Sequence, residues 1–370
     1  MTNTLVKYAV FSALAAVFAG CGMNIAIIDN SVTPDADLTT ARSLKLMDSD
    51  GPLYIKETVS DDGKGTYEFS QNRQPIVDTP DIVTADFHQA EYNLNQYMVV
   101  EGQIADGKTY PFILDTGANL DALIIQDIHI RQNDLQVFPL NKTTGPESKM
   151  SLCSVDNIQI GDFKLSEYTA ICWGQHTELK FLGLIPLGRS KDICFPLPMM
   201  RKFKYFKFDT PARQVEFSAR KSFKPQQDEN WHKFPMTVEY IDNDPAKQLL
   251  FIEMQINGQN IRPMLDTGAG LGLMMDNHLW HQVKGSFNQT SQKNTNFILP
   301  YHFKDNKPNC KAVTVETLDL GDISINNAEV IVMPKSKNWK KTDCIMGMAY
   351  FKDKQVTIDF QTNTLWVKKS

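Results

Sequence analysis

The sequence predicts an all-β chain that is built from two similar lobes. Apolar and polar residues alternate along much of the chain, and Asp-Gly or Asn-Gly turns separate these runs, which favours antiparallel hairpins over helices. Three landmarks also recur in the same order in the two halves, at separations of 151, 160 and 150 residues. An internal duplication accounts for such nearly constant separations, so we expect the two halves to fold alike.

The first landmark is a turn that carries a carboxylate. Residues 112–118 read Phe-Ile-Leu-Asp-Thr-Gly-Ala, and residues 263–269 read Pro-Met-Leu-Asp-Thr-Gly-Ala. In each stretch an apolar strand runs into a tight Thr-Gly turn. The duplication therefore places Asp115 and Asp266 at equivalent ends of two equivalent strands.

A hairpin is predicted before each of these turns. The first covers residues 98–114 and turns at Asp106-Gly107, and the second covers residues 250–265 and turns at Asn257-Gly258. Only short helices are expected, and the segments that favour them are residues 276–283 and 197–203. The lack of long helical patterns argues against the doubly wound phosphate-binding folds that also use Asp-x-Gly turns.

The other two landmarks are hairpins. A Gly-Asp turn joins two apolar runs over residues 155–163 and again over residues 315–323. Further on, residues 208–217 and 358–367 each pair two short apolar runs. The fall in separation from 160 to 150 residues places about ten additional residues in the first half, near Leu187–Pro198.

The chain divides into five predicted segments. They are a signal peptide (1–20), a tether (21–80), a first lobe (81–222), a polar, proline-containing linker (223–231) and a second lobe (232–370). Within the tether, residues 54–55 and 66–69 favour one more hairpin, which we expect to pack under both lobes.

The N-terminus has the pattern of a secretory signal. Lys7 precedes an apolar run over residues 8–18, and small residues then lead to Cys21. The run Phe-Ala-Gly-Cys resembles the lipobox of bacterial lipoproteins, which implies that Cys21 is acylated and becomes the new N-terminus. Gly22 follows where an inner-membrane retention signal usually has Asp, so the resemblance implies an outer-membrane lipoprotein that faces the periplasm. The alternative is a secretory signal in which this cysteine is incidental.

Composition argues against some classes of protein. The chain is 42% hydrophobic and 22% charged, as globular domains are, and its formal net charge of −5 argues against a nucleic-acid partner. No Cys-x-x-Cys pair occurs, so the sequence predicts no zinc site. An oxidising compartment would permit disulfides, for which Cys310 with Cys344 and Cys153 with Cys172 are hypotheses; Cys194 makes the number odd.

The duplicated turns supply what metal-free peptide hydrolysis requires. Two carboxylates that share one proton provide both a base for water and an acid for the amide, because like charges about 3 Å apart cannot both ionise. Gly117 and Gly268 allow the backbone to turn sharply and to approach the other lobe. The hydroxyls of Thr116 and Thr267 are placed to form hydrogen bonds across the two-fold axis and to fix both turns.

These motifs resemble the retropepsin and pepsin group of aspartic proteases over roughly residues 92–370. Residues 181–183 and 345–347 are similar to the apolar-apolar-Gly motif that lies behind the catalytic turn in that family. Residues 356–360 and 365–367 resemble the closing strands of its bacterial members. The resemblance implies two acid-protease-like β-barrel lobes with the active-site cleft between them, and a monomer that needs no partner chain.

Two features depart from the family pattern. Ala118 and Ala269 stand where pepsin-like lobes usually have Ser, whose hydroxyl lowers the pKa of the catalytic carboxylate, so we expect a raised dyad pKa and activity nearer neutral pH. The flap segments are also less recognisable, with residues 141–145 and 297–309, including Tyr301, as candidates.

The sequence therefore predicts a lipid-anchored periplasmic aspartic endopeptidase that uses the Asp115/Asp266 dyad on extended peptides. His278 and His281 lie three apart on a predicted helix, but no third ligand accompanies them, and we expect neither a metal nor another cofactor. The alternative is a non-catalytic peptide-binding or envelope-assembly lipoprotein on the same scaffold, blocked by an extra loop near Cys194.

Overall fold

The structure of the 370-residue chain is a computed structural model. It describes residues 26–27, 53–59, 65–71, 80–92, 95–105, 107–119, 121–135, 137–140, 150–173, 178–181, 185–189, 192–226, 229–241, 244–295, 310–334 and 342–368.

A small sheet precedes the two lobes. It consists of β1 (Ala26–Ile27), β2 (Leu53–Val59) and β3 (Gly65–Gln71) in the order β1-β3-β2. Strands β2 and β3 are antiparallel, with Ile55 opposite Phe69, so the predicted extra hairpin is confirmed. The packing of its side chains, which was expected under both lobes, lies outside the described part of the chain.

The first lobe consists almost entirely of strands. Its elements are β4 (Val83–Tyr92), β5 (Asn95–Ile104), β6 (Lys108–Asp115), β7 (Leu123–Gln126), α4 (Asp127–Asn133), β8 (Val137–Leu140), β9 (Met150–Ile160), β10 (Phe163–Trp173), β11 (Glu178–Phe181), β12 (Ile185–Arg189), β13 (Ile193–Pro196), α5 (Leu197–Met200), β14 (Tyr205–Asp209) and β15 (Gln214–Ser218).

The second lobe repeats this order. Its elements are β16 (Trp231–Ile241), β17 (Asp244–Ile252), β18 (Met254–Ile256), β19 (Gln259–Ile261), β20 (Met264–Leu265), β21 (Leu273–Asp276), α6 (Asn277–Val283), η2 (Lys284–Ser286), β22 (Gln289–Thr295), β23 (Cys310–Leu320), β24 (Ile323–Met333), β25 (Cys344–Met346), η4 (Met348–Phe351), β26 (Gln355–Asp359) and β27 (Thr364–Lys368).

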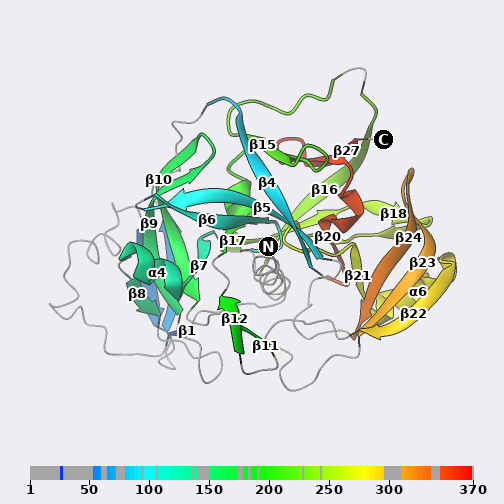
Figure 1. Cartoon of the computed structure of the whole chain (residues 1–370), viewed down its shortest axis with the longest axis horizontal. Helices are drawn as coiled ribbons and strands as arrows, with labels where there is room; N and C mark the ends of the chain where they lie inside the picture. The colour runs from blue at the N-terminus through cyan, green and yellow to red at the C-terminus, as the bar shows by residue number, and fades with distance from the viewer. Residues whose placement is uncertain are drawn as a thin grey trace.

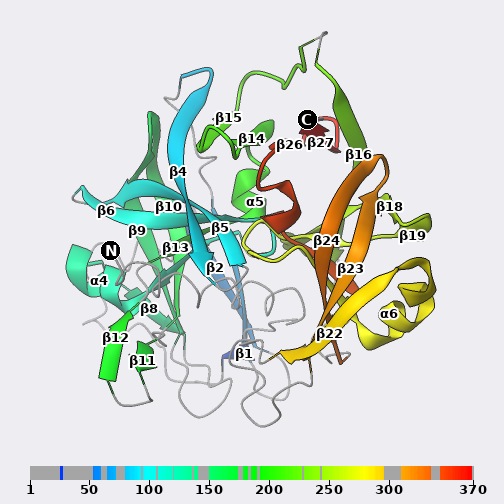
Figure 2. The ribbon, with the colours of Figure 1, turned by 45° about the vertical axis from the view of Figure 1, so that its right-hand side comes forward.

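The predicted all-β architecture of two similar lobes is confirmed. Figures 1 and 2 show the first lobe, cyan to green, beside the second, whose colours run from the green of β16 through yellow to red. The predicted hairpins β5–β6, β9–β10, β18–β19 and β23–β24 are all present. The turn of β18–β19 has positive φ at both central residues, 47° at Asn257 and 76° at Gly258, which is the backbone that an Asn-Gly turn favours.

A sheet shared by both lobes holds them together. Its strands run β4-β15-β14-β26-β27-β16, all antiparallel, and the lobes meet where β14 pairs with β26. One face of β14 and β26 is apolar and buried, with Phe206, Phe208 and Ile358 in the core. Burial of large apolar side chains from both lobes in one sheet opposes their separation.

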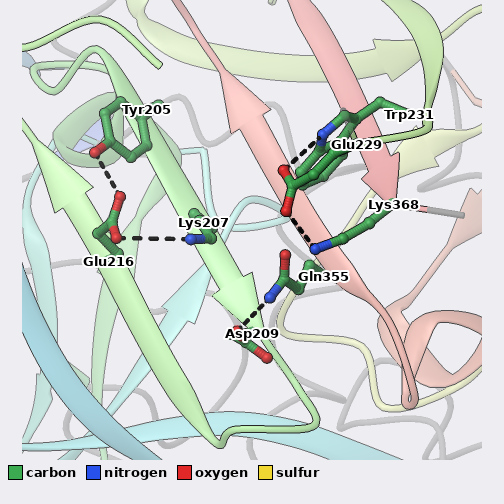
Figure 3. A network of polar contacts seen from close by, with 8 residues as sticks. All are labelled: Tyr205, Lys207, Asp209, Glu216, Glu229, Trp231, Gln355 and Lys368. Carbon is green, nitrogen blue, oxygen red and sulfur yellow. Dashed lines mark hydrogen bonds and ion pairs between the residues drawn. The ribbon is translucent and has the colours of Figure 1, made fainter. Parts of the chain in front are cut away.

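Polar contacts cover other positions of this sheet (Figure 3). On β14 and β15, Tyr205 donates a hydrogen bond of 2.7 Å to Glu216, which also pairs with Lys207 at 3.7 Å. Across the lobe boundary, Gln355 donates to Asp209 at 2.5 Å. This last contact joins β26 of the second lobe to β14 of the first.

The strand behind each Asp-Thr-Gly turn corrects one prediction. In the second lobe β25 runs parallel to β20 and Gly347 follows it, as the resemblance implied. In the first lobe the equivalent strand is β13, parallel to β6, with Pro196 opposite Asp115. The prediction that residues 181–183 fill this place is wrong, since Phe181 ends β11, which pairs with β12.

The additional residues of the first half explain that error. Between the end of β10 and the start of β13 lie residues 174–192, which include the β11–β12 hairpin, whereas residues 334–343 suffice between β24 and β25. Pro196 stands where the motif has glycine and directly precedes α5. The backbone φ of −83° at this position is compatible with the proline ring.

The cysteines do not form the two suggested disulfides. The described cysteines Cys153, Cys172, Cys194, Cys310 and Cys344 are buried and form no disulfide. In the β9–β10 pair, Cys153 lies opposite Ala170 and Cys172 opposite Ser151, so the two thiols are offset along the strands. Cys310 and Cys344 lie on β23 and β25, and the sheet order β23-β24-β21-β25 separates those strands.

No helix in the described part of the chain is long and apolar enough to cross a membrane.

Candidate active site

The two Asp-Thr-Gly turns meet where the lobes meet. Asp115 ends β6, and Asp266 directly follows β20. The side chains of both are almost fully buried, at 3% and 0% exposure. Burial of two neighbouring carboxyl groups is costly, which makes a structural role a poor explanation for this pair.

Reciprocal threonine contacts fix the turns to each other. The amide of Thr116 donates to Oγ1 of Thr267 at 3.0 Å, and the amide of Thr267 donates to Oγ1 of Thr116 at the same distance. Each hydroxyl then donates to a carbonyl of the other lobe, Thr116 to Leu265 at 2.8 Å and Thr267 to Leu114 at 2.6 Å. The predicted hydrogen bonds across the two-fold axis are confirmed, and they give the dyad a rigid base.

Each glycine of the turns lies against the carboxylate of the other lobe. A Cβ atom on Gly117 would lie 2.5 Å from Cγ of Asp266, and one on Gly268 would lie 2.4 Å from Cγ of Asp115. Such distances leave no room for a side chain. Glycine is therefore required here because it lets the two carboxyl groups cross over the opposite turn.

Asp115 has well-formed hydrogen-bond donors. Its Oδ1 accepts from the amides of Gly117 at 2.8 Å and Ala118 at 3.1 Å. The thiol of Cys194 lies 3.6 Å from Oδ2. These donors favour the ionised form of this carboxyl group.

The carboxyl group of Asp266 has different hydrogen-bond surroundings. Its two carboxyl oxygens are buried, and the amides of Gly268 and Ala269 act on them and lower the carboxyl pKa without forming well-aligned hydrogen bonds. The Ala269 amide, equivalent to the one that donates to Asp115 in the first lobe, donates to the backbone carbonyl of Asp266 at 3.1 Å. Two ionised carboxylates are acceptors only, so Asp115 and Asp266 form a hydrogen bond only when one of them carries a proton.

Burial raises both carboxyl pKa values. Burial raises the pKa of Asp115 above its ordinary value of 3.8, although its hydrogen bonds oppose the rise. Burial also raises the pKa of Asp266, well above 3.8, and the neighbouring charge of Asp115 adds to that rise. Two adjacent carboxyl groups that share one proton are the arrangement that general acid–base chemistry on an amide needs.

The residues after the turns are alanines with buried methyl groups. Ala118 is 0% exposed and Ala269 4%, and neither brings a hydroxyl to the carboxylates. The pKa values of both carboxyl groups are raised, as the sequence predicts, but burial rather than the missing hydroxyls is the largest cause.

Cys194 is the neighbour that sequence reasoning placed wrongly. The sequence places the blocking loop near Cys194, but Cys194 lies within β13, next to the Asp115 strand and opposite Ile113. An alignment of β13 with β25 at the constant separation of 151 residues would have paired it with Ile345. That alignment would have shown a thiol in one lobe where the other has a hydrocarbon.

A second contact between the lobes was also missed. Arg201, which follows α5 of the first lobe, donates to the side chain of Gln248 on β17 at 2.6 Å. The amide of Gln248 donates to the carbonyl of Asn119 at 3.3 Å, four residues after Asp115. These bonds tie the second lobe to the loop beside the dyad, and no local sequence pattern marks them because the partners are distant in the chain.

The two histidines that the sequence offered as possible metal ligands lie away from this site. His278 and His281 lie exposed on α6, where His278 contacts Gln282 at 3.1 Å. No group of three metal-ligating side chains occurs among the residues that the structure describes. Cys21 and the flap candidates 141–145 and 297–309 lie outside those residues.

Comparison with known families points to the same chemistry. Residues 252–353, which include Asp266, match the family described as gag-polyprotein putative aspartyl protease. This part of the chain resembles a retropepsin-like aspartic-protease domain. The match covers only the second lobe, and the first lobe is related to it through the internal duplication.

Similar solved structures have low sequence identity. They include basic 7S globulin from soybean (10% identity, TM-score 0.43, 78% of this chain and 95% of that one). The others are edgp (12%, 0.44, 78% and 95%) and conglutin gamma from lupine seeds (9%, 0.42, 79% and 95%). At these TM-scores they add nothing to the functional argument. No curated protein sequence matches the chain.

Proposed function

We propose that this chain is an aspartic endopeptidase with Asp115 and Asp266 as its catalytic dyad. The observation that supports this most is the crossing of two buried carboxyl groups from two lobes over each other's turn glycines. The threonine contacts hold this arrangement, and the raised pKa of both groups makes a shared proton its resting state.

The chemistry requires both carboxyl groups in turn. The ionised one removes a proton from a water molecule, whose oxygen bonds to the scissile carbonyl carbon, while the protonated one donates its hydrogen bond to the carbonyl oxygen. The tetrahedral intermediate then collapses, the C–N bond breaks, and the leaving nitrogen takes the proton that the first carboxyl group removed from water. The products are a carboxylic acid and an amine, and the dyad again holds one proton.

The proposed substrate is an extended peptide. Both halves of the site lie in one chain, so the enzyme works as a monomer, and its reaction uses no cofactor. We further propose that Cys21 carries a lipid that anchors the enzyme to the bacterial outer membrane on its periplasmic side. The signal-like residues 1–20 support that location.

Peptide-library cleavage tests the proposal. The full chain in detergent is incubated with a diverse library from about pH 3 to about pH 8, with and without pepstatin. We expect cuts within peptides that pepstatin suppresses, with an optimum above the strongly acidic range. A folded chain that cuts nothing at any pH supports the non-catalytic peptide-binding alternative instead.

A further inference from the structure

The two carboxyl groups of the dyad have unequal surroundings, although the turns that carry them are equivalent. Asp115 accepts two amide hydrogen bonds and has a thiol 3.6 Å from its other oxygen. The equivalent amides of Gly268 and Ala269 act on Asp266 without well-aligned hydrogen bonds to its oxygens, and no thiol is among the groups that act on this carboxyl. A difference of this kind decides which of the two carries the shared proton.

The Cys194 thiol contributes to this difference through a side chain that only the first lobe has. Cys194 lies on β13, parallel to the strand of Asp115, and Ile345 holds the equivalent place on β25, parallel to the strand of Asp266. Cys194 is buried, at 2% exposure, and Ile345 is fully buried. One lobe thus places an S–H donor behind its carboxylate, and the other places a hydrocarbon that cannot donate.

We infer that Cys194 is a positioning residue that keeps Asp115 as the ionised member of the dyad and leaves the shared proton on Asp266. Its catalytic consequence depends on the proposed function, whereas the unequal protonation can be measured in a protein that cuts nothing. Asp115 is then the base for water, and Asp266 is the acid that faces the scissile carbonyl.

The thiol remains a donor at ordinary pH. Burial raises the pKa of Cys194 well above its ordinary value of 9.0, and the neighbouring charge of Asp115 adds to the rise. The titratable groups that act on the thiol among the described residues are Asp115 and, more weakly, Asp266, and their negative charges oppose the loss of the thiol proton. A neutral S–H beside a carboxylate is a weak but permanent hydrogen-bond donor.

Vibrational spectroscopy of the full chain tests the contact between the Cys194 thiol and Asp115. S–H stretching bands fall where protein groups other than thiols do not absorb, and the band of Cys194 is identified among those of the other thiols by its loss in Cys194→Ala. We expect Asp115→Asn to shift this band and Asp266→Asn to shift it much less. Equal bands in the wild type and Asp115→Asn would overturn the inference.

Titration of the two dyad carboxyl groups tests whether Asp115 is the ionised member. With ¹³C-labelled aspartate, assigned through the two Asp→Asn variants, we expect Asp115 to ionise first. Cys194→Ala is expected to raise the lower apparent pKa of the dyad by roughly half a unit, because a weak donor to the ionised form is lost. Cys194→Ser, which keeps a donor, leaves it unchanged or lowers it, and Ile345→Val serves as the packing control in the other lobe.

The outcomes separate this inference from the proposed function. Equal shifts in the Ala and Ser variants, or ionisation of Asp266 first, contradict the role of Cys194 even in an active enzyme. Unequal titration in a chain that cleaves no peptide supports that role while the proposed function fails. In an active enzyme the acidic limb of the kcat/KM profile moves to higher pH in Cys194→Ala, together with the titration.

Discussion

The threonine contacts across the lobes give a prediction whose size follows from the structure. Thr267→Val keeps the shape of the side chain and removes its hydroxyl. The amide of Thr116 then loses its acceptor at 3.0 Å, and the carbonyl of Leu114 loses its donor at 2.6 Å. Both groups belong to the buried lobe interface, where water cannot replace the lost partner.

An unsatisfied buried polar group costs about 1–3 kcal/mol, so two such groups lower the free energy of unfolding by about 2–6 kcal/mol. Urea denaturation measures this loss. The matched control is Thr364→Val, because the Thr364 hydroxyl donates to the carbonyl of Thr362 at 3.2 Å on the exposed surface. We expect this substitution to change the free energy of unfolding by no more than about 0.5 kcal/mol. The reasoning is refuted if Thr267→Val destabilises the chain no more than this control does.

The remaining predictions concern the turn glycine and the buried charges. Gly117→Ala places a methyl group 2.5 Å from Cγ of Asp266, so we expect the free energy of unfolding to fall by roughly 1–3 kcal/mol and kcat to fall strongly. The control is Gly285→Ala, where a Cβ atom meets nothing within 4 Å. Equal effects of the two substitutions on the urea midpoint and on cleavage would contradict the crossed geometry. Because burial raises the folded-state pKa of Asp266 above 3.8, its contribution to stability is complete below the ordinary pKa and is lost as pH rises through the folded-state pKa. Asp266→Asn is therefore expected to gain thermal stability relative to the wild type at about pH 8 and to lose this advantage near about pH 3, and a difference in melting temperature that does not change with pH would contradict it.

Much of the architecture follows from short-range sequence signals. The Asn257-Gly258 turn has the positive φ values that few other residue pairs adopt, so it fixes the register of β18 and β19. The repeated Asp-Thr-Gly turns predicted that the two lobes meet there. The threonine hydroxyls can form their hydrogen bonds, and the glycines can allow a close approach, only when a second turn faces the first. The short helix predicted over residues 276–283 is α6, with Asp276 accepting from the amide of Leu279 at 2.7 Å as its N-cap.

Other features depend on contacts between distant residues. The strand β13 was missed because Pro196 replaces the expected glycine and the β11–β12 hairpin shifts its position in the sequence. The two disulfide hypotheses failed because a count of cysteines carries no information on strand order. The place of Cys194 beside Asp115 required the register of β13 against β6, which only the folded chain supplies.

The central claim is that one carboxyl group from each lobe is needed for peptide hydrolysis. The most direct measurement is cleavage of a single substrate peptide by the full chain, by Asp115→Asn and by Asp266→Asn, each checked for folding by circular dichroism. The shared-proton dyad predicts that the wild type cleaves the peptide and that either substitution alone abolishes cleavage. Undiminished cleavage by either folded variant would contradict it.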